Sequence, residues 1–250
     1  MSLIEIEHVT RRFGGLLAVD DVTTRVEDGE LVGVIGPNGA GKTTLFNLIS
    51  GFTPLSSGSV RFKGETISGL KPHRIAARGM SRTFQNLRVF PNMSVFDNVS
   101  VGAVGAMGQS ALGAVFGGSA RADAISARTW EAIERVGLAA EAEELAANLS
   151  YGKRKYLEIA RALAMKPDLL ILDEPAAGLN DSETAELARF IKALNGAGMA
   201  IMLVEHDMNL VMGICSRVVV LASGRKIADA EPAVVRADPV VLEAYLGVED

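Results

Sequence analysis

The chain has 250 residues, of which 48% are hydrophobic, and a formal net charge of −5. This length suffices for one large or two small domains with a substantial core, and the acidic balance argues against a protein that binds nucleic acid through a broadly basic surface. Cys215 is the only cysteine, which excludes a disulfide within the chain, and its apolar neighbours favour a buried packing role. Residues 1–5 lack the features of a secretory signal.

Strands are predicted at the start of the chain. Residues 3–9 alternate between apolar and polar side chains, which is typical of a half-exposed strand. A second strand is predicted over 22–26, and a third, short and continuously apolar, over 31–35. We therefore expect an antiparallel β-region ahead of the first α/β unit.

A glycine-rich loop follows the third strand. Its sequence GPNGAGKT, at 36–43, fulfils the pattern G-x-x-x-x-G-K-[ST], and the residues after it predict a helix. Backbone N–H groups of such a loop and the helix N-terminus bind phosphate oxygens, Lys42 neutralises the β- and γ-phosphates, and Thr43 offers a hydroxyl to Mg²⁺. The predicted nucleotide-binding residues of this region are Gly36, Pro37, Asn38, Gly39, Ala40, Gly41, Lys42, Thr43 and Thr44.

The residues after the first helix alternate between short elements. A turn is predicted at 56–59, a strand at 60–62 and a short helix at 72–79. Residues 80–85 form a strand-like run that ends in the polar amide of Gln85. We expect Gln85 to lie at a sheet edge, where its amide oxygen can reach a metal ion or a water.

An alanine-rich region from Ser94 to about Leu149 predicts a separate helical lobe, with helices at 122–136 and 139–147. Within it, residues 98–120 carry no charge. Their many glycines and polar residues make them a poor membrane span and favour a flexible or loosely helical connector.

A second chemical motif lies at 169–175, where a continuous apolar run ends in Asp173 and Glu174. Open α/β sheets bind ligands at the carboxyl ends of their strands. Asp173 suits a hydrated Mg²⁺, and Glu174 suits polarisation of an attacking water. Two acids at a strand end can also be solvated turn residues, but together with the phosphate-binding loop they favour phosphoryl transfer.

The last third alternates between helix and strand. A helix at 182–195 and a buried strand at 199–204 are followed by His206 and by Asp207, which is expected to cap a helix at 208–214. A hairpin is predicted at 217–228 and a closing helix at 239–246.

Phe13 and His206 each allow two interpretations. Phe13, ahead of the phosphate-binding loop, is either ordinary core or a platform that stacks on a nucleotide base. His206 is either a structural residue or, at the end of its strand, a contact for a γ-phosphate.

With these motifs in order, nearly the whole chain resembles the ATP-binding subunits of ABC transporters. The sequence LSYGK at 149–153 is similar to the family signature L-S-G-G-Q. Tyr151 and Lys153 depart from it, whereas Ser150 and Gly152 are kept, so a hydroxyl and a helix N-terminus are still offered to a γ-phosphate. Lys153 either adds charge near that phosphate or is solvated on a basic helix face. In residues 177–180, the D-loop of the family, Asn180 replaces the usual aspartate.

The resemblance implies an α/β fold: a P-loop NTPase of the ABC type with a mixed sheet core, an antiparallel β subdomain and a helical subdomain. One ABC ATPase domain would span 1–250, with the core and β region at 1–93 and 150–250 and the helical subdomain at 94–149, extending into the signature helix. The implied cofactors are ATP and Mg²⁺. Glu174, His206 and Gln85 would be catalytic, Phe13, Ser150 and Gly152 would join the loop in binding nucleotide, and Thr43, Gln85 and Asp173 would hold the metal.

Several runs, among them RTFQN at 82–86 and the ending DPVVLEAYLG at 238–247, resemble importer subunits for branched-chain and other hydrophobic amino acids. The resemblance implies two membrane permease subunits, a second ATPase subunit in a head-to-tail dimer, indirectly a solute-binding protein, and a peripheral position on the cytoplasmic face of the inner membrane. No nucleic acid is expected.

Other classes of protein are weighed against this interpretation. The lipopolysaccharide-export ATPase resembles the same pattern, and the cytosolic ATPase of iron–sulfur assembly is hard to reject on physical grounds. A P-loop kinase or GTPase has no need of the signature before Asp173. ABC proteins of DNA repair and translation carry long coiled coils or a duplicated ATPase, and this chain has neither.

Overall fold

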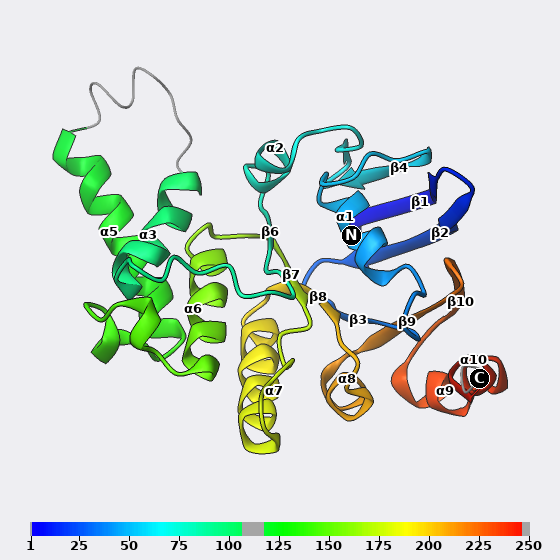
Figure 1. Cartoon of the computed structure of the whole chain (residues 1–250). Coiled ribbons are helices and arrows are strands. Elements are labelled where there is room, and N and C mark those ends of the chain that lie inside the picture. The colour runs from blue at the N-terminus through cyan, green and yellow to red at the C-terminus, as the bar shows by residue number, and fades with distance from the viewer. Residues whose placement is uncertain (1, 107–117, 247–250) are drawn as a thin grey trace. The chain divides into compact units, whose positions relative to one another are not determined.

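The computed structural model describes residues 2–106 and 118–246 (Figure 1). The chain forms two compact units, one of Met1–Ile75 with Ile171–Asp250 and the other of Ala76–Leu170. Within the described ranges, no helix is long and apolar enough to cross a membrane. Residues 107–117 of the expected connector lie outside the described residues.

The first unit contains an antiparallel sheet in the order β2-β1-β4-β5. β1 and β2 form a hairpin that is longer than the sequence predicts, because the pairing continues to Phe13 and Leu16. The turn predicted at 56–59 is wrong, since Ser57 and Ser59 pair with β1 and belong to β4. The four strands are β1 (Ser2–Phe13), β2 (Leu16–Glu27), β4 (Ser57–Phe62) and β5 (Glu65–Thr66).

A second sheet of this unit has the order β10-β9-β3-β8-β7. β3 pairs in parallel with both β8 and β9, and β10 runs antiparallel to β9. Every residue of β3, β7 and β8 is buried, which explains their continuous apolar sequences. The strands are β3 (Leu31–Ile35), β7 (Leu169–Asp173), β8 (Ala200–Val204), β9 (Arg217–Ala222) and β10 (Arg225–Ala230).

Helices lie between these strands and after the last of them. Asp207 caps α8 by accepting hydrogen bonds from the Asn209 and Leu210 amides, as predicted. The helix α9 was not predicted. The helices are α1 (Lys42–Ile49), α2 (Pro72–Ala76), α7 (Asp181–Gly196), α8 (Met208–Ile214), α9 (Pro232–Ala237) and α10 (Pro239–Leu246).

The second unit is mainly helical, and α3 packs against both α5 and α6. The helix predicted at 139–147 is wrong: only two 3₁₀ turns form there, because the Glu144 carbonyl and the Ala146 amide pair with Val95 and Met93 instead of continuing a helix. The elements are β6 (Met80–Arg82), α3 (Val95–Ala106), α5 (Gly118–Arg135), η1 (Ala139–Glu141), η2 (Ala146–Asn148) and α6 (Tyr151–Leu163).

Candidate functional site

The glycine-rich loop follows β3 and has the positive φ angles that its glycines predict, 152° at Gly36, 79° at Gly39 and 98° at Gly41. A Cβ on Gly36 would lie 2.1 Å from the Leu221 carbonyl oxygen, so a side chain there would force the loop to move. Gly41 precedes α1, and no side chain caps this helix. The helix N-terminus is therefore available to an anion.

Lys42 is folded back into its own loop and is only 6% exposed. Its Nζ donates to the carbonyl oxygens of Gly36 at 2.6 Å and Pro37 at 3.0 Å. Burial lowers the pKa of Lys42, whereas the negative charges of Glu174 and Asp173 act in the opposite direction. An ammonium group thus lies inside a ring of backbone groups, which suits a phosphate oxygen as an additional partner.

Two acids and a histidine meet at the ends of β7 and β8. Asp173 is the buried last residue of β7, and the Glu174 amide donates to the Val204 carbonyl at 2.9 Å. Glu174 has a left-handed φ of 50°, which is uncommon and costly for a residue with a side chain. Its Oε1 lies 2.7 Å from Nε2 of His206. The structure thus joins two residues that the sequence predicted separately.

Glu205 is a residue of this site that the sequence analysis missed. Its buried carboxylate accepts from the amide of Ala176 at 2.7 Å and from that of His206 at 3.1 Å. Burial raises the pKa of Glu205, although these hydrogen bonds oppose the shift. The carboxylate therefore ties the segment after Glu174 to the segment that carries His206. The only signal in the sequence is an acid directly after a buried strand.

Phe13 ends β1 and is 45% exposed, so the core reading of this residue is wrong. The guanidinium carbon of Arg11 lies 4.4 Å from the centroid of the Phe13 ring. An exposed aromatic ring with a cation on it is a suitable surface for stacking a flat base.

Gln85 lies in the second unit, in an exposed bend beyond β6. The expectation that it ends a strand is wrong, because β6 stops at Arg82 and the amide of Phe84 donates to the Glu158 carboxylate at 3.3 Å.

The signature sequence also belongs to the second unit. Ser150 is the N-cap of α6, where its Oγ accepts from the Lys153 amide at 3.3 Å, and Gly152 is buried in the first turn. Lys153 Nζ lies 2.5 Å from Glu141 Oε1, and this hydrogen bond raises the pKa of Lys153. The pairing favours the solvated, surface reading of Lys153.

The C-terminal part of the chain supports the phosphate-binding loop. In the turn between β9 and β10, the Gly224 amide donates to the Ala40 carbonyl at 3.1 Å, and the Gly224 carbonyl accepts from the Asp20 amide at 2.8 Å. Tyr245 of α10 is hydrogen-bonded to the Gly36 backbone, while burial raises the pKa of its phenol to about 12. The sequence analysis found neither contact.

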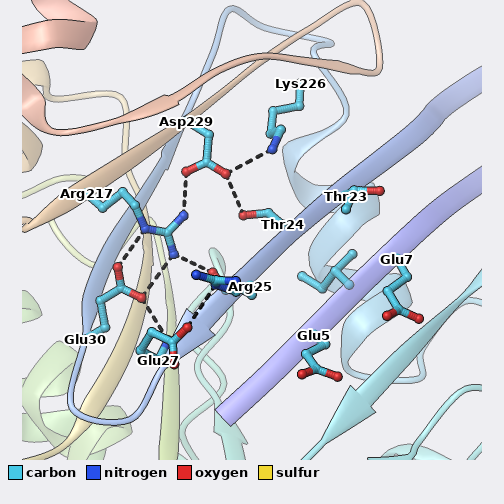
Figure 2. Close-up of a pocket in the computed structure, with 11 residues that line it drawn as sticks. Glu5, Glu7, Thr23, Thr24, Arg25, Glu27, Glu30, Arg217, Lys226 and Asp229 are labelled. Atoms are coloured by element: carbon cyan, nitrogen blue, oxygen red, sulfur yellow. Dashed lines mark hydrogen bonds and ion pairs between the residues drawn. The ribbon is translucent and has the colours of Figure 1, made fainter. Parts of the chain in front are cut away.

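A charged cavity of about 600 Å³ lies away from the phosphate-binding loop, between β1, β2, β9 and β10 of the first unit (Figure 2). Arg217 contacts Glu30 at 2.7 Å and Asp229 at 2.5 Å and also donates to the Arg25 carbonyl. Asp229 in addition accepts from Thr24 and Lys226, each at 3.0 Å. We call Arg217, Glu30, Asp229, Lys226 and Thr24 the Arg217 cluster.

Comparisons with known proteins agree with this geometry. Residues 19–177 match the family model described as ABC transporter, and residues 225–250 match one described as branched-chain amino acid ATP-binding cassette transporter. The chain is 43% identical, over 98% of each chain, to the high-affinity branched-chain amino acid transport ATP-binding protein BraF of Pseudomonas aeruginosa. It is 42% identical, again over 98% of each chain, to LivG of Escherichia coli K12, which has the same description.

A solved structure is similar over the whole chain. The ADP conformation of MJ1267, an ATP-binding cassette of an ABC transporter, has a TM-score of 0.86 and 30% identity and covers 99% of each chain. The loop around Lys42, the acids after β7 and the signature ahead of them thus occur in a chain whose similarity to such cassettes extends from end to end. The chain belongs to the ABC transporter family, among its ATP-binding subunits.

Proposed function

We propose that this chain hydrolyses ATP to drive the uptake of branched-chain or other hydrophobic amino acids through membrane permease subunits. The observation that carries the ATPase role is the arrangement of Lys42 inside its loop, with Glu174 and His206 in contact in the same unit. The names of BraF and LivG and the match over residues 225–250 support the substrate class. They favour it over lipopolysaccharide export and iron–sulfur assembly.

The site fits a nucleoside triphosphate. Lys42 holds a positive charge in a loop with no room for a side chain at Gly36, and α1 presents an uncapped N-terminus. These groups would bind the β- and γ-phosphates, while the exposed ring of Phe13 would stack on the base. Asn38, Ala40 and Thr44 would complete the cradle.

Oxygen ligands for Mg²⁺ are present in the chain. Asp173 ends the buried strand β7, the Thr43 hydroxyl lies in the first turn of α1 beyond the buried strand β3, and the Gln85 amide would be the third ligand. When bound, Mg²⁺ supplies positive charge that neutralises phosphate oxygens as the leaving group departs.

Hydrolysis then depends on proton transfer and on charge. Glu174 accepts the proton of the attacking water as a general base, and the 2.7 Å contact with His206 holds its carboxylate in position. The side chain of His206 is 46% exposed. Because Nε2 contacts Glu174, its other ring nitrogen, Nδ1, would donate a hydrogen bond to a γ-phosphate oxygen. Lys42 stabilises the charge that develops on the transferred group.

The proposed assembly is a head-to-tail pair of ATPase subunits on the cytoplasmic face of the membrane. Ser150 and Gly152 at the N-terminus of α6 would complete the nucleotide site of the partner subunit, because the first-turn amides that the Ser150 cap does not occupy, together with the helix dipole, offer donors to phosphate. ATP would favour the closed pair through contacts of its γ-phosphate with both subunits. Two permease subunits would receive this motion, and a solute-binding protein would deliver the amino acid to them.

The variant Glu174→Gln tests the ATPase role. It should bind Mg-ATP as the wild type does but lose turnover by about a hundredfold or more, because the amide cannot accept the proton of water. Bound ATP should then accumulate as closed pairs, detected by light scattering. Lys42→Ala is the comparison variant, and it should lose nucleotide affinity.

Equilibrium binding with a fluorescent ATP analogue separates the two effects. If Glu174→Gln loses ATP as completely as Lys42→Ala does, Glu174 is a binding residue and the assigned mechanism is wrong.

A further inference from the structure

A buried carboxylate on the signature helix has no role in the mechanism above. Glu158 lies in the middle of α6 and is only 4% exposed. A carboxylate removed from water is unfavourable unless donors satisfy it. The groups that donate hydrogen bonds to the Glu158 carboxylate therefore indicate the role of this residue.

Two of these donors are backbone amides of the turn that contains Gln85. Glu158 Oε1 accepts from the Phe84 amide at 3.3 Å, and the Arg88 amide is also hydrogen-bonded to this carboxylate. Phe84 and Arg88 bracket Gln85 on both sides. One side chain thus holds both ends of the 84–88 turn, through charge-assisted hydrogen bonds of the stronger kind.

Stacked side chains stiffen the same turn. Two guanidinium groups approach the ring of Phe84, with Arg82 at 5.3 Å and Arg88 at 4.3 Å from its centroid. Arg161, one turn beyond Glu158 on α6, approaches Glu158 Oε1 to 3.9 Å and lies 5.6 Å from the centroid of Phe90. The segment on either side of Gln85 is therefore fixed to α6 at several points.

The helix itself is held firmly within the unit. A Cβ on Gly102 of α3 would lie 2.1 Å from the Arg161 carbonyl oxygen, so the backbones of α3 and α6 are in close contact there. The N-terminus of α6 is fixed by the Ser150 cap and by the ion pair of Lys153 with Glu141. The 84–88 turn and Ser150 are therefore attached to the same helix, the turn at the middle of α6 and Ser150 at its N-terminus.

We propose that Glu158 is a positioning residue that couples Gln85 to Ser150 through helix α6. This inference rests on the proposed function, in which Gln85 contributes to the Mg²⁺ site of its own chain and Ser150 completes the nucleotide site of the partner subunit. Glu158 then links the two nucleotide sites of one pair. ATP bound at one site would set the position of Ser150 at the other, which is cooperativity between the sites.

Amide hydrogen exchange tests whether Glu158 holds the 84–88 turn. In Glu158→Ala, the amides of Phe84 and Arg88 should exchange about tenfold faster than in the wild type, because they lose their acceptor. Glu158→Gln keeps one oxygen acceptor without the charge and should be intermediate. Glu143→Gln, which changes an exposed carboxylate of the same unit, is the matched control and should leave exchange unchanged.

Steady-state ATPase kinetics of the full chain test whether Glu158 couples the two nucleotide sites. Both Glu158 variants should keep the KM for ATP within about twofold, since phosphate binding belongs to the loop around Lys42, while kcat falls about tenfold and the Hill coefficient for ATP falls toward one. A merely structural role would lower the melting temperature without this separation of kcat from KM. If Glu158→Ala does not fold, Glu158→Gln carries the test.

The outcomes are distinguishable. Unchanged exchange of residues 84–88 in the Glu158 variants would overturn the proposal, as would faster exchange with an unchanged kcat and Hill coefficient. A wild-type chain without ATPase activity would overturn the proposed function, and the exchange comparison could still be made without hydrolysis.

Discussion

Two regions of the first unit gather charged side chains, and they use them in opposite ways. In the Arg217 cluster each charge meets an opposite charge: Arg217 bridges Glu30 and Asp229, and Lys226 shares Asp229 with it (Figure 2). At the nucleotide site, Lys42 is hydrogen-bonded to carbonyl oxygens, and Asp173 and Glu174 influence it only through space.

The difference concerns what each region can still bind. A closed set of ion pairs has satisfied its own charges, so the cavity beside it has little to offer a ligand, and its contribution is to join β2, β9 and β10. A lysine whose charge is not fully compensated, next to a glutamate with a strained backbone, retains the capacity to bind and react. A cavity lined by paired charges is therefore a weaker indication of function than a buried ammonium group whose hydrogen bonds go to backbone carbonyl oxygens.

The largest expected effect is on ATPase activity, which should depend on the nucleotide site and not on surface contacts of the same kind. His206→Ala should lower kcat by about a hundredfold, because Glu174 loses the group that positions it, while the free energy of unfolding changes by less than about 1 kcal/mol. His8→Ala is the matched control: His8 also contacts a carboxylate at 2.8 Å, that of Asp21, but lies at the surface of β1. ATPase assays and urea unfolding of both variants decide the point, and equal activities would remove His206 from the mechanism.

A stability effect is expected from the Arg217 cluster. Arg217→Ala leaves Glu30 and Asp229 without their main partner and should destabilise the fold by about 2–4 kcal/mol, with kcat per folded molecule unchanged. Arg225→Ala removes an exposed pair with Asp20 and should cost less than about 1 kcal/mol. Urea unfolding measures both. If Arg225→Ala lowers the free energy of unfolding as much as Arg217→Ala does, burial does not determine how much these ion pairs stabilise the fold.

The smallest effect is a pH dependence at Asp229. Burial alone would raise the pKa of Asp229, but hydrogen bonds and charge from Arg217 and Lys226 outweigh it and lower this pKa below the ordinary value of 3.8. The ionised carboxylate therefore stabilises the fold above that value, and this contribution is lost as the pH falls through the lowered pKa. Asp229→Asn should be less stable than the wild type by at most about 1 kcal/mol near neutral pH, a figure reduced for solvent screening.

The corresponding measurement is urea unfolding between pH 3 and pH 7. The stability gap between Asp229→Asn and the wild type should narrow below about pH 4. A gap that stays constant over this range would show that Asp229 does not titrate in the manner described.

The parts of the site that follow from sequence are those set by neighbours along the chain. The loop at 36–43 could be predicted because its glycines and Lys42 act within a few residues of one another. Asp173 and Glu174 could be located because a strand buried on both faces reads as a continuous apolar run.

The remaining parts depend on contacts between distant segments. The alanines at 139–147 favour a helix, but pairing with Met93 and Val95 overrides that propensity. Glu205 and Glu158 acquire their roles only when other segments bring amides to their carboxylates. The spacing of apolar residues indicates which face of a helix or strand is buried. It does not indicate which hydrogen-bond donor from another segment will lie against a buried carboxylate.

The support of the phosphate-binding loop by Gly224 and Tyr245 bears on the order in which the protein is made. A ribosome releases the chain from the N-terminus, and segments begin to fold as they emerge. The loop at 36–43 emerges first, whereas the turn with Gly224 and the helix with Tyr245 follow it only after the intervening strands and helices. A chain interrupted during translation would therefore contain the phosphate-binding sequence without its supporting contacts. We expect nucleotide binding to begin only after the segments that carry Gly224 and Tyr245 have been made and have folded onto the loop.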